Sequence, residues 1–420
     1  SGLLNSMFSA GPRSFLWVLL LFLALESAVP RLQAQEFDWG GSFRVYPFLR
    51  LEKLALEEEL GGSGPLSRRD TELLILRLTG DAFFGQHVRL EIHPLLEFVS
   101  PSRLLGPSGL ATSTAPTFLP LEHVFTDSPD VELIGSFDRL NLQIDWNHTR
   151  IVIGRQAVTW GVAYFWPSLD LFAPFSPRRV DRDYKPGIDA IRATIPLGAF
   201  SEVEVIGAIL GPSLSRDGTL AALTRFNLGP LDWGLMGGRF HRDTVAGSFL
   251  TADAWGTGLR AEVSWTQSGD PEDRVRDRRT FWRAAAGVDR QLTPTFLVTA
   301  EFSFNGYGAS QASDYLDWIT ADRVLRGEIN ALGRFYTGVS GVWRFHPLGT
   351  ITHTLLINFQ DPSTLWVPSF QWSTSNNSDV LAGAQIGIGK GLQSSGMGPV
   401  PQSEYGLVPN TLFAAIRVYF

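Results

Sequence analysis

The chain contains no cysteine, and this absence excludes several classes of site and scaffold. Disulfide frameworks, thiolate zinc sites, a cysteine nucleophile and a lipid anchor on cysteine are all ruled out. Charged residues make up only 18% of the 420 residues, and lysine occurs only as Lys53, Lys185 and Lys390. The net charge of −7 is modest and no basic cluster is present, so nothing indicates a nucleic-acid partner.

Long apolar runs are also missing after residue 34, where no stretch reaches the roughly 20 apolar residues of a membrane-spanning helix. Residues 15–25, FLWVLLLFLAL, form an uninterrupted apolar run preceded by Arg13. This run is too short to cross a bilayer and matches the apolar region of a secretory signal, with cleavage after Ala34. We therefore expect a signal peptide with an N-terminal extension over 1–34 and one unit over 35–420. The alternative is a buried helix of a soluble protein.

What the sequence does contain is alternation of apolar and polar residues with a period of two. Val88, Leu90 and Ile92 alternate with polar residues, and the pattern recurs in Phe296 to Phe304 and in Leu259 to Trp265. Each such stretch predicts a strand with one apolar and one polar face. The predicted strands lie near 37–50, 71–83, 86–98, 132–146, 149–156, 187–196, 200–210, 219–228, 231–241, 245–253, 256–267, 280–291, 295–305, 334–345, 350–360, 364–374, 379–390 and 410–420.

The connections between these strands alternate in length. Short ones such as Phe84-Gly85 and Asn147-His148 are followed by long ones, although 242–244 and 361–363 are short where the alternation predicts a long connection. Short turns on one side and long loops on the other are typical of membrane β-barrels, whereas a soluble β-sandwich predicts no such asymmetry. The long connections are 51–70, 99–131, 157–186, 268–279, 306–333 and 391–409.

The final strand supports the same interpretation. In LFAAIRVYF, alternate residues from Leu412 to Phe420 share one apolar face. This strand resembles the C-terminal signature of bacterial outer-membrane barrels, which end in an aromatic residue, and the strand and loop pattern over 35–420 is similar to porin-type barrels.

The resemblance implies an all-β fold, a transmembrane antiparallel up-and-down barrel of about 18 strands, or about 16 as an alternative, with long external loops and short periplasmic turns. It implies the outer membrane of a Gram-negative bacterium, with lipid and lipopolysaccharide as partners. Ile416, Val418 and Phe420 would be the signal that the barrel-assembly machinery reads. The oligomeric state is left open.

The loop 157–186 is the candidate functional insert, because it carries four prolines and clustered aromatic and charged residues. In general porins the loop at this place folds into the barrel and forms its constriction, so the resemblance implies the same here. The alternative is a structured loop that packs on the barrel rim. The candidate constriction residues are Trp160, Trp166, Asp170, Arg178, Arg179, Asp181, Arg182, Asp183 and Lys185.

Charged residues on the polar strand faces would line the lumen, and their mixed signs predict weak ionic selectivity. A polar lumen also needs such residues merely to stay hydrated. The predicted lumen-lining residues are Arg89, Glu91, His93, Asp145, Glu202, Glu204, Arg260, Glu262, Arg283, Asp289, Glu301, Arg344 and Arg417.

The expected function is therefore a channel for passive diffusion of small hydrophilic solutes. An alternative is a barrel closed by its loops that exports or binds a surface polysaccharide, with Tyr315 and Trp318 stacking on sugars. A third is an outer-membrane enzyme. No HExxH or GxSxG spacing occurs, so we expect no catalytic residues, no metal and no cofactor.

Overall fold

The computed structural model describes residues 36–51, 70–100, 117–128, 131–269, 279–395 and 398–420. The predicted signal peptide, 1–34, lies outside the described residues, as do parts of the long connections at 52–69, 101–116 and 270–278. No helix among the described residues is both long enough and apolar enough to cross a membrane.

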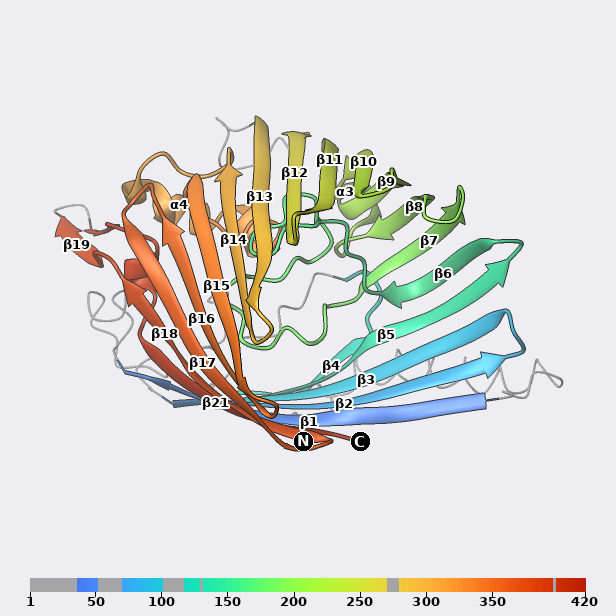
Figure 1. Cartoon of the computed structure of the whole chain (residues 1–420), viewed down its shortest axis with the longest axis horizontal. Coiled ribbons are helices and arrows are strands. Elements are labelled where there is room, and N and C mark those ends of the chain that lie inside the picture. The colour runs from blue at the N-terminus through green and yellow to red at the C-terminus, as the bar shows by residue number, and fades with distance from the viewer. Residues whose placement is uncertain (1–35, 52–69, 101–116, 129–130, 270–278, 396–397) are drawn as a thin grey trace, which may run out of the picture.

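Eighteen antiparallel strands form one closed ring, which confirms the predicted fold class (Figure 1). Each strand pairs with its neighbours in chain order, and the last strand pairs with both the first strand and the one before it, which closes the barrel. The strands of the ring are β1 (Glu36–Arg50), β2 (Asp70–Phe84), β3 (Val88–Ser100), β5 (Glu132–Trp146), β6 (Thr149–Gln156), β7 (Ile188–Pro196), β8 (Glu202–Ile209), β9 (Gly218–Asn227), β10 (Leu231–Phe240), β11 (Asp243–Ala254), β12 (Thr257–Gln267), β13 (Thr280–Thr293), β14 (Phe296–Asn305), β15 (Phe335–His346), β16 (Gly349–Asn358), β17 (Ser363–Ser375), β18 (Ser378–Ile388) and β21 (Thr411–Tyr419).

Burial alternates along the strands as the period of two predicts. On β1, Arg44 and Tyr46 are buried toward the inside, while Phe43 and Leu49 are exposed on the outside. Since side chains of a strand point to opposite faces in turn, one face supplies an apolar belt and the other fills the interior. Large aromatic side chains are exposed near strand ends, among them Trp39, Trp146, Trp255, Trp282 and Trp343.

The seam between β1 and β21 requires a glycine. Gly41 N donates to Phe420 O at 2.8 Å, and Phe420 N donates to Gly41 O at 3.0 Å. A Cβ on Gly41 would lie 2.6 Å from the carbonyl oxygen of Arg77 and 2.7 Å from the Phe420 ring. The outer face of β21 carries Ile416 and Val418, and Phe420 follows directly after the strand; all three are exposed, as predicted from their alternation.

A short strand that the sequence pattern did not predict extends the sheet of the barrel wall. Strand β4 (Glu122–Asp127) pairs with β5 over Glu132–Ser136, whereas β6 pairs with β5 only from Leu140 onward. Thus β4 extends the sheet where the shorter β6 has ended and the chain has turned inward. Its sequence EHVFTD has no clear alternation and all its side chains are exposed, so periodicity gives no signal for it.

Smaller elements lie in the remaining long connections. The connection from β14 to β15 contains η4 (Ala312–Asp314), α4 (Tyr315–Ile319) and α5 (Asp322–Leu325). The connection from β18 to β21 contains the hairpin of β19 (Leu392–Ser395) and β20 (Gly398–Pro401), followed by η5 (Tyr405–Leu407). A single helical turn, α3 (Leu214–Asp217), precedes β9.

Candidate functional site: a loop inside the barrel

The segment between β6 and β7, residues 157–187, lies within the space that the strands enclose and is called the inner loop below (Figure 1). Its polar contacts reach β8, β12, β14, β18, β1 and β5, largely in that order along the chain. Because these strands follow one another around the ring, the inner loop makes a circuit of the inner wall.

The first part of the circuit is apolar. Trp160, Leu169 and Phe172 are buried against inward-facing residues of β8 to β11, including Ile206 and Phe249. Burying aromatic and aliphatic side chains of this size stabilises each by about 1.5–3 kcal/mol. The inner face of this part of the wall is therefore apolar, and the inner loop covers it.

Glu262 of β12 then holds the inner loop by its backbone. One carboxylate oxygen accepts hydrogen bonds from Val162 N at 2.6 Å and Ala163 N at 3.0 Å. The other accepts from Ser168 N and from Leu169 N, the latter at 3.2 Å. Both oxygens of this buried carboxylate are thus occupied by backbone amides.

Glu301 of β14 does the same for the next residues. Tyr164 N donates at 2.6 Å to one oxygen, and Phe165 N and Trp166 N each donate at 3.0 Å to the other. A charged acceptor makes hydrogen bonds roughly twice as strong as a neutral one, and backbone amides inside a barrel need partners. We call Glu262 and Glu301 the carboxylate clasp.

The circuit continues along β18 and across the seam. Gln385 of β18 donates to the carbonyl of Arg178 at 2.7 Å. On β1, Arg44 Nη1 lies 2.9 Å from Asp181 Oδ2. On β21, Arg417 Nη1 lies 3.6 Å from Asp183 Oδ2. These contacts fasten the charged part of the inner loop to the two strands that close the barrel.

The end of the inner loop returns to its beginning. Lys185 Nζ donates at 2.6 Å to Asp170 Oδ1 and at 2.5 Å to the carbonyl of Val158. Arg139 of β5 donates to the carbonyl of Lys185 at 2.7 Å. Both charged groups of the Lys185–Asp170 pair are buried, and the pair joins the two halves of the circuit into a closed collar.

The residues that flank the inner loop form hydrogen bonds with the segment that leads into β4. Arg155 at the end of β6 makes two bonds to Asp189 at the start of β7, at 2.9 and 3.0 Å. Asp189 also accepts from Phe118 N and Leu119 N, just before β4. One buried carboxylate therefore positions both the inner loop and the segment that leads into β4.

Comparisons with known proteins bear on this fold. No family model and no curated protein matches the sequence. Among solved structures, the chain is similar to OccAB1 of Acinetobacter baumannii, with a TM-score of 0.53 at 8% identity over 92% of this chain and 97% of that one. It is also similar to the outer membrane protein OpdK of Pseudomonas aeruginosa, with a TM-score of 0.52 at 9% identity over 92% and 100%. OccAB2 of A. baumannii gives 0.52 at 10% identity over 93% and 99%.

At these identities the likeness concerns the fold. The chain has the fold of a porin-type outer-membrane β-barrel. The expected resemblance to this class is thereby confirmed at the level of architecture, and no single protein is matched in sequence.

Within this porin-type barrel, the candidate constriction residues all lie on the inner loop. Trp160 is buried, and its Nε1 donates to Glu204. Arg182 donates to carbonyls of the inner loop itself, one of them that of Arg179 at 3.2 Å. The alternative of a loop packed only on the rim does not match contacts that reach strands all around the ring.

The predicted lumen residues of the porin-type barrel divide into two groups. In the first group, each charged side chain forms a hydrogen bond or an ion pair with the inner loop. These residues are Glu204, Glu262, Glu301, Arg283 and Arg417. These positions were expected to present fixed charge to a solute, but the inner loop covers them, which corrects that expectation.

The second group lies nearer the short turns and is less buried. Asp145 pairs with Arg150, Glu202 with Arg225, and Arg260 with Asp289. Arg344 is exposed at the end of β15. The remaining members, Arg89, Glu91 and His93, belong to the cluster described next.

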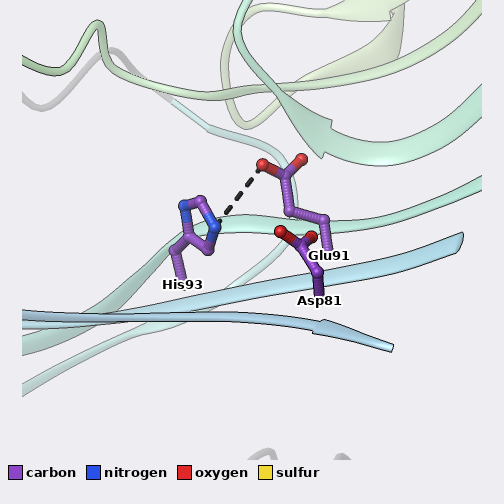
Figure 2. Close-up of side chains that lie close together, drawn as sticks. All are labelled: Asp81, Glu91 and His93. Atoms are coloured by element: carbon purple, nitrogen blue, oxygen red, sulfur yellow. Dashed lines mark ion pairs between the residues drawn. The ribbon is translucent and has the colours of Figure 1, made fainter. Parts of the chain in front are cut away.

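Three potential metal ligands meet on β2 and β3. Asp81, Glu91 and His93 each offer one ligand atom, and these atoms lie within 4.8 Å of one another (Figure 2). His93 Nε2 lies 3.5 Å from Glu91 Oε1. However, Arg89 binds Asp81 at 2.9 Å and Asn141 donates to Glu91 at 2.7 Å. Because the protein already satisfies both carboxylates, we assign no metal to this cluster.

A second polar network, which the sequence did not reveal, joins three external connections. Glu404 accepts from the Tyr336 hydroxyl and from Asn358 Nδ2, the latter at 3.0 Å. Asp361 accepts from Tyr315 Oη at 2.6 Å and from Glu404 N at 2.8 Å. Burial, together with nearby Asp361, raises the pKa of Glu404 to about 7. Only long-range packing brings these residues together, so no spacing could have identified them.

Proposed function

We propose that this chain is an outer-membrane channel for passive diffusion of small hydrophilic solutes, with the inner loop as its constriction. A ring of about eighteen strands encloses a space wide enough for water unless something fills it. The proposal is supported by one observation above all, the circuit of the inner loop around the wall. A chain fastened at many points narrows a lumen to a defined width, whereas a loosely held chain would give a fluctuating one.

The mixed charge on the barrel wall nearer the short turns further supports a route for polar solutes. Acidic and basic residues both occur among the less buried groups, for example Asp289 with Arg260 and Glu202 with Arg225. Rings of fixed charge orient polar solutes and set ion preference, and mixed signs weaken any preference for one sign. We therefore propose a channel of weak ionic selectivity.

The polysaccharide alternative loses its main support in the structure. Tyr315 is 0% exposed and its hydroxyl donates to Asp361. Trp318 packs against Tyr307 and donates to its carbonyl at 2.8 Å. The buried ring of Tyr315 is therefore not free to stack on a sugar, and Trp318 is partly buried, which favours the channel over a glycan platform made by these two residues.

The channel is tested by conductance in planar bilayers. The purified chain should produce discrete current steps, and deletion of residues 162–183 should enlarge them because the collar is removed. A matched control is deletion of residues 392–401, the hairpin of β19 and β20, which should leave the step size unchanged. A folded, heat-modifiable barrel that gives no conductance, with or without the inner loop, would contradict the proposal.

A further inference from the structure

The seam between β1 and β21, which closes the barrel, is interrupted in its middle. The two strands pair over residues 42–45 of β1 and again over 48–50. Between these runs, Tyr46 and Pro47 have no paired residue on β21, although both strands lie within the described part of the chain. On its other side Pro47 does pair, with Glu72 of β2. Proline has no N–H to donate, so the ladder of backbone hydrogen bonds cannot run unbroken along the seam.

Two like charges also face each other across this seam. Arg44 of β1 and Arg417 of β21 are directly opposite in the register, and both are buried on the inner face. Like charges at directly opposite positions destabilise a strand pair. Asp379 of β18 compensates Arg417, since its Oδ1 lies 2.7 Å from Arg417 Nη2. Among the described residues, the carboxylates that pair with Arg44 all belong to the inner loop.

The inner loop brings two carboxylates to these arginines. Arg44 Nη1 lies 2.9 Å from Asp181 Oδ2 and 3.5 Å from Asp183 Oδ2. The same oxygen of Asp183 lies 3.6 Å from Arg417 Nη1 and accepts a hydrogen bond from Tyr419 Oη at 3.1 Å. One carboxylate oxygen therefore contacts both strands of the seam.

The surroundings of Arg44 strengthen these contacts. Its guanidinium carbon lies 4.8 Å from the ring centroid of Tyr184 on the inner loop and 5.8 Å from that of Tyr419 on β21. The Arg44 side chain is 1% exposed and that of Asp181 is 11% exposed, so little water screens their pair. Asp183 is 34% exposed, so water screens its pairs more strongly, and the two carboxylates have to be considered together.

We propose that Asp181 and Asp183 form a brace across the seam, so that the inner loop holds the barrel closed. This seam brace places negative charge between two arginines that would otherwise repel each other, beside the position where the ladder is interrupted. An unpaired strand edge in a membrane has no water to pair with, so support from inside the barrel favours the closed ring. Because the brace needs both strands in place, docking of the inner loop and closure of the ring are coupled.

Hydrogen–deuterium exchange of the purified full chain in detergent measures the seam directly. The double variant Asp181→Asn and Asp183→Asn removes both charges and keeps the side-chain shapes. Backbone amides of β1 and β21 should exchange faster than in the parent chain by on the order of 10-fold, as expected for the loss of a hydrogen bond to a charged group. Amides of β10 and β11, away from the seam, should exchange as in the parent chain.

The matched control is Asp289→Asn, which removes a wall carboxylate that pairs with Arg260 and is 32% exposed, close to the value for Asp183. It should leave exchange in β1 and β21 unchanged. A third variant adds Arg44→Gln to the double variant and so removes one of the two facing positive charges. Exchange in β1 and β21 should then return toward the rate of the parent chain.

The proposal is overturned if β1 and β21 exchange in the double variant as they do in Asp289→Asn, or if Arg44→Gln does not slow exchange in the double variant. Should the double variant give no heat-modifiable barrel, Asp183→Asn alone decides by the same comparison. Failure of the channel is separate, because closure does not require conduction. A braced barrel that passes no current would reject the channel and keep the brace.

Discussion

At the scale of single residues, several charged side chains inside the barrel are buried and form hydrogen bonds with the backbone, where a lumen-facing charge would be expected to contact water. Glu262 and Glu301 direct their carboxylate oxygens at amides of the inner loop, and Asp189 does the same for the segment before β4. Such buried carboxylates are tolerated because several N–H groups replace water around each of them. Removing one partner therefore leaves groups that are costly to bury unpaired.

The Lys185–Asp170 pair gives a first prediction. In Lys185→Met, Asp170 stays buried without its cation, which should destabilise the inner loop by about 3–5 kcal/mol. Limited proteolysis of the folded barrel should show new cleavage within 157–187. Arg150→Gln, at an exposed pair, should leave the cleavage pattern unchanged, and equal protection in both variants would contradict a role for the buried pair.

Glu404 gives a prediction about pH. Its pKa is raised from 4.5 to about 7. Between these two pH values the folded network therefore holds a proton that the unfolded chain releases. The external network should therefore be most stable below pH 4.5 and lose stability, on the order of 3 kcal/mol, as pH rises through 7.

Protease sensitivity of the connections 306–334 and 389–410, measured from pH 5 to pH 8, checks this expectation. Glu404→Gln keeps a neutral side chain of the same shape and should remove the pH dependence. A pH profile that is the same in the parent chain and in this variant would show that another group titrates.

At the scale of elements, the inner loop is a long irregular segment that acquires fixed positions from the wall. It has no regular secondary structure, so its amides depend on strand side chains for partners. The carboxylate clasp supplies many of these partners within eight consecutive positions, from Val162 to Leu169. The conformation of the inner loop is therefore determined by the side chains of the surrounding strands.

Breaking the clasp should change conductance without removing any residue of the inner loop. In the double variant Glu262→Ala and Glu301→Ala, the amides of 162–169 lose their charged acceptors, at roughly 1–3 kcal/mol for each group left unpaired. Bilayer recordings should show larger and noisier current steps than those of the parent chain.

A control for the clasp keeps the barrel and removes carboxylates elsewhere. The double variant Glu202→Ala and Asp289→Ala removes two wall carboxylates that bind arginines of neighbouring strands, Arg225 and Arg260. Its current should be as steady as that of the parent chain. Similar noise in both double variants would assign the effect to lost wall charge and would remove the clasp from the explanation.

At the scale of the whole molecule, closure depends on the seam between the first and last strands. The first and last strands of the ring, β1 and β21, are the farthest apart in sequence. They must pair so that the backbone N–H and C=O groups along both strand edges have hydrogen-bond partners. A strand edge inside a membrane has no water to pair with, so an open barrel is strongly disfavoured.

The seam glycine gives a prediction at this scale. Gly41→Ala places a Cβ 2.6 Å from the backbone carbonyl of Arg77 on β2, which cannot move away as a flexible side chain could, and 2.7 Å from the Phe420 ring across the seam. The fraction of chain that migrates as a heat-modifiable barrel after refolding should fall. Gly207→Ala on β8, where no atom lies within 4 Å of the added Cβ, should refold normally. Equal yields for the two variants would contradict a tight seam.

Much of the architecture could be predicted because it depends on local pattern. A period of two places apolar side chains on one face of each strand, so strands such as 132–146 and 149–156 were predicted at their observed bounds. Alternation along the final strand likewise predicted that Ile416 and Arg417 lie on opposite faces. Strand β4 was missed because it extends the sheet without a pattern of its own.

The contacts of the inner loop could not be predicted in the same way. Arg44 and Asp181 are 137 positions apart, and they meet because ring closure brings β1 opposite the returning chain. Glu262 and Glu301 look in sequence like any other polar residues of a lumen-facing strand. Their role depends on which amides lie within hydrogen-bond reach, a property of three-dimensional position alone.

By itself, then, the sequence determined the strands of the ring, their two faces and the parity of the connections, because all three follow from the two-residue repeat and from turn length. Only the tertiary structure decided that the inner loop runs around the wall, that two glutamates hold its backbone and that Asp361 and Glu404 meet in one network. The physical reason is that hydrogen bonds and ion pairs act over a few ångströms, and closure of the ring determines which residues come that close.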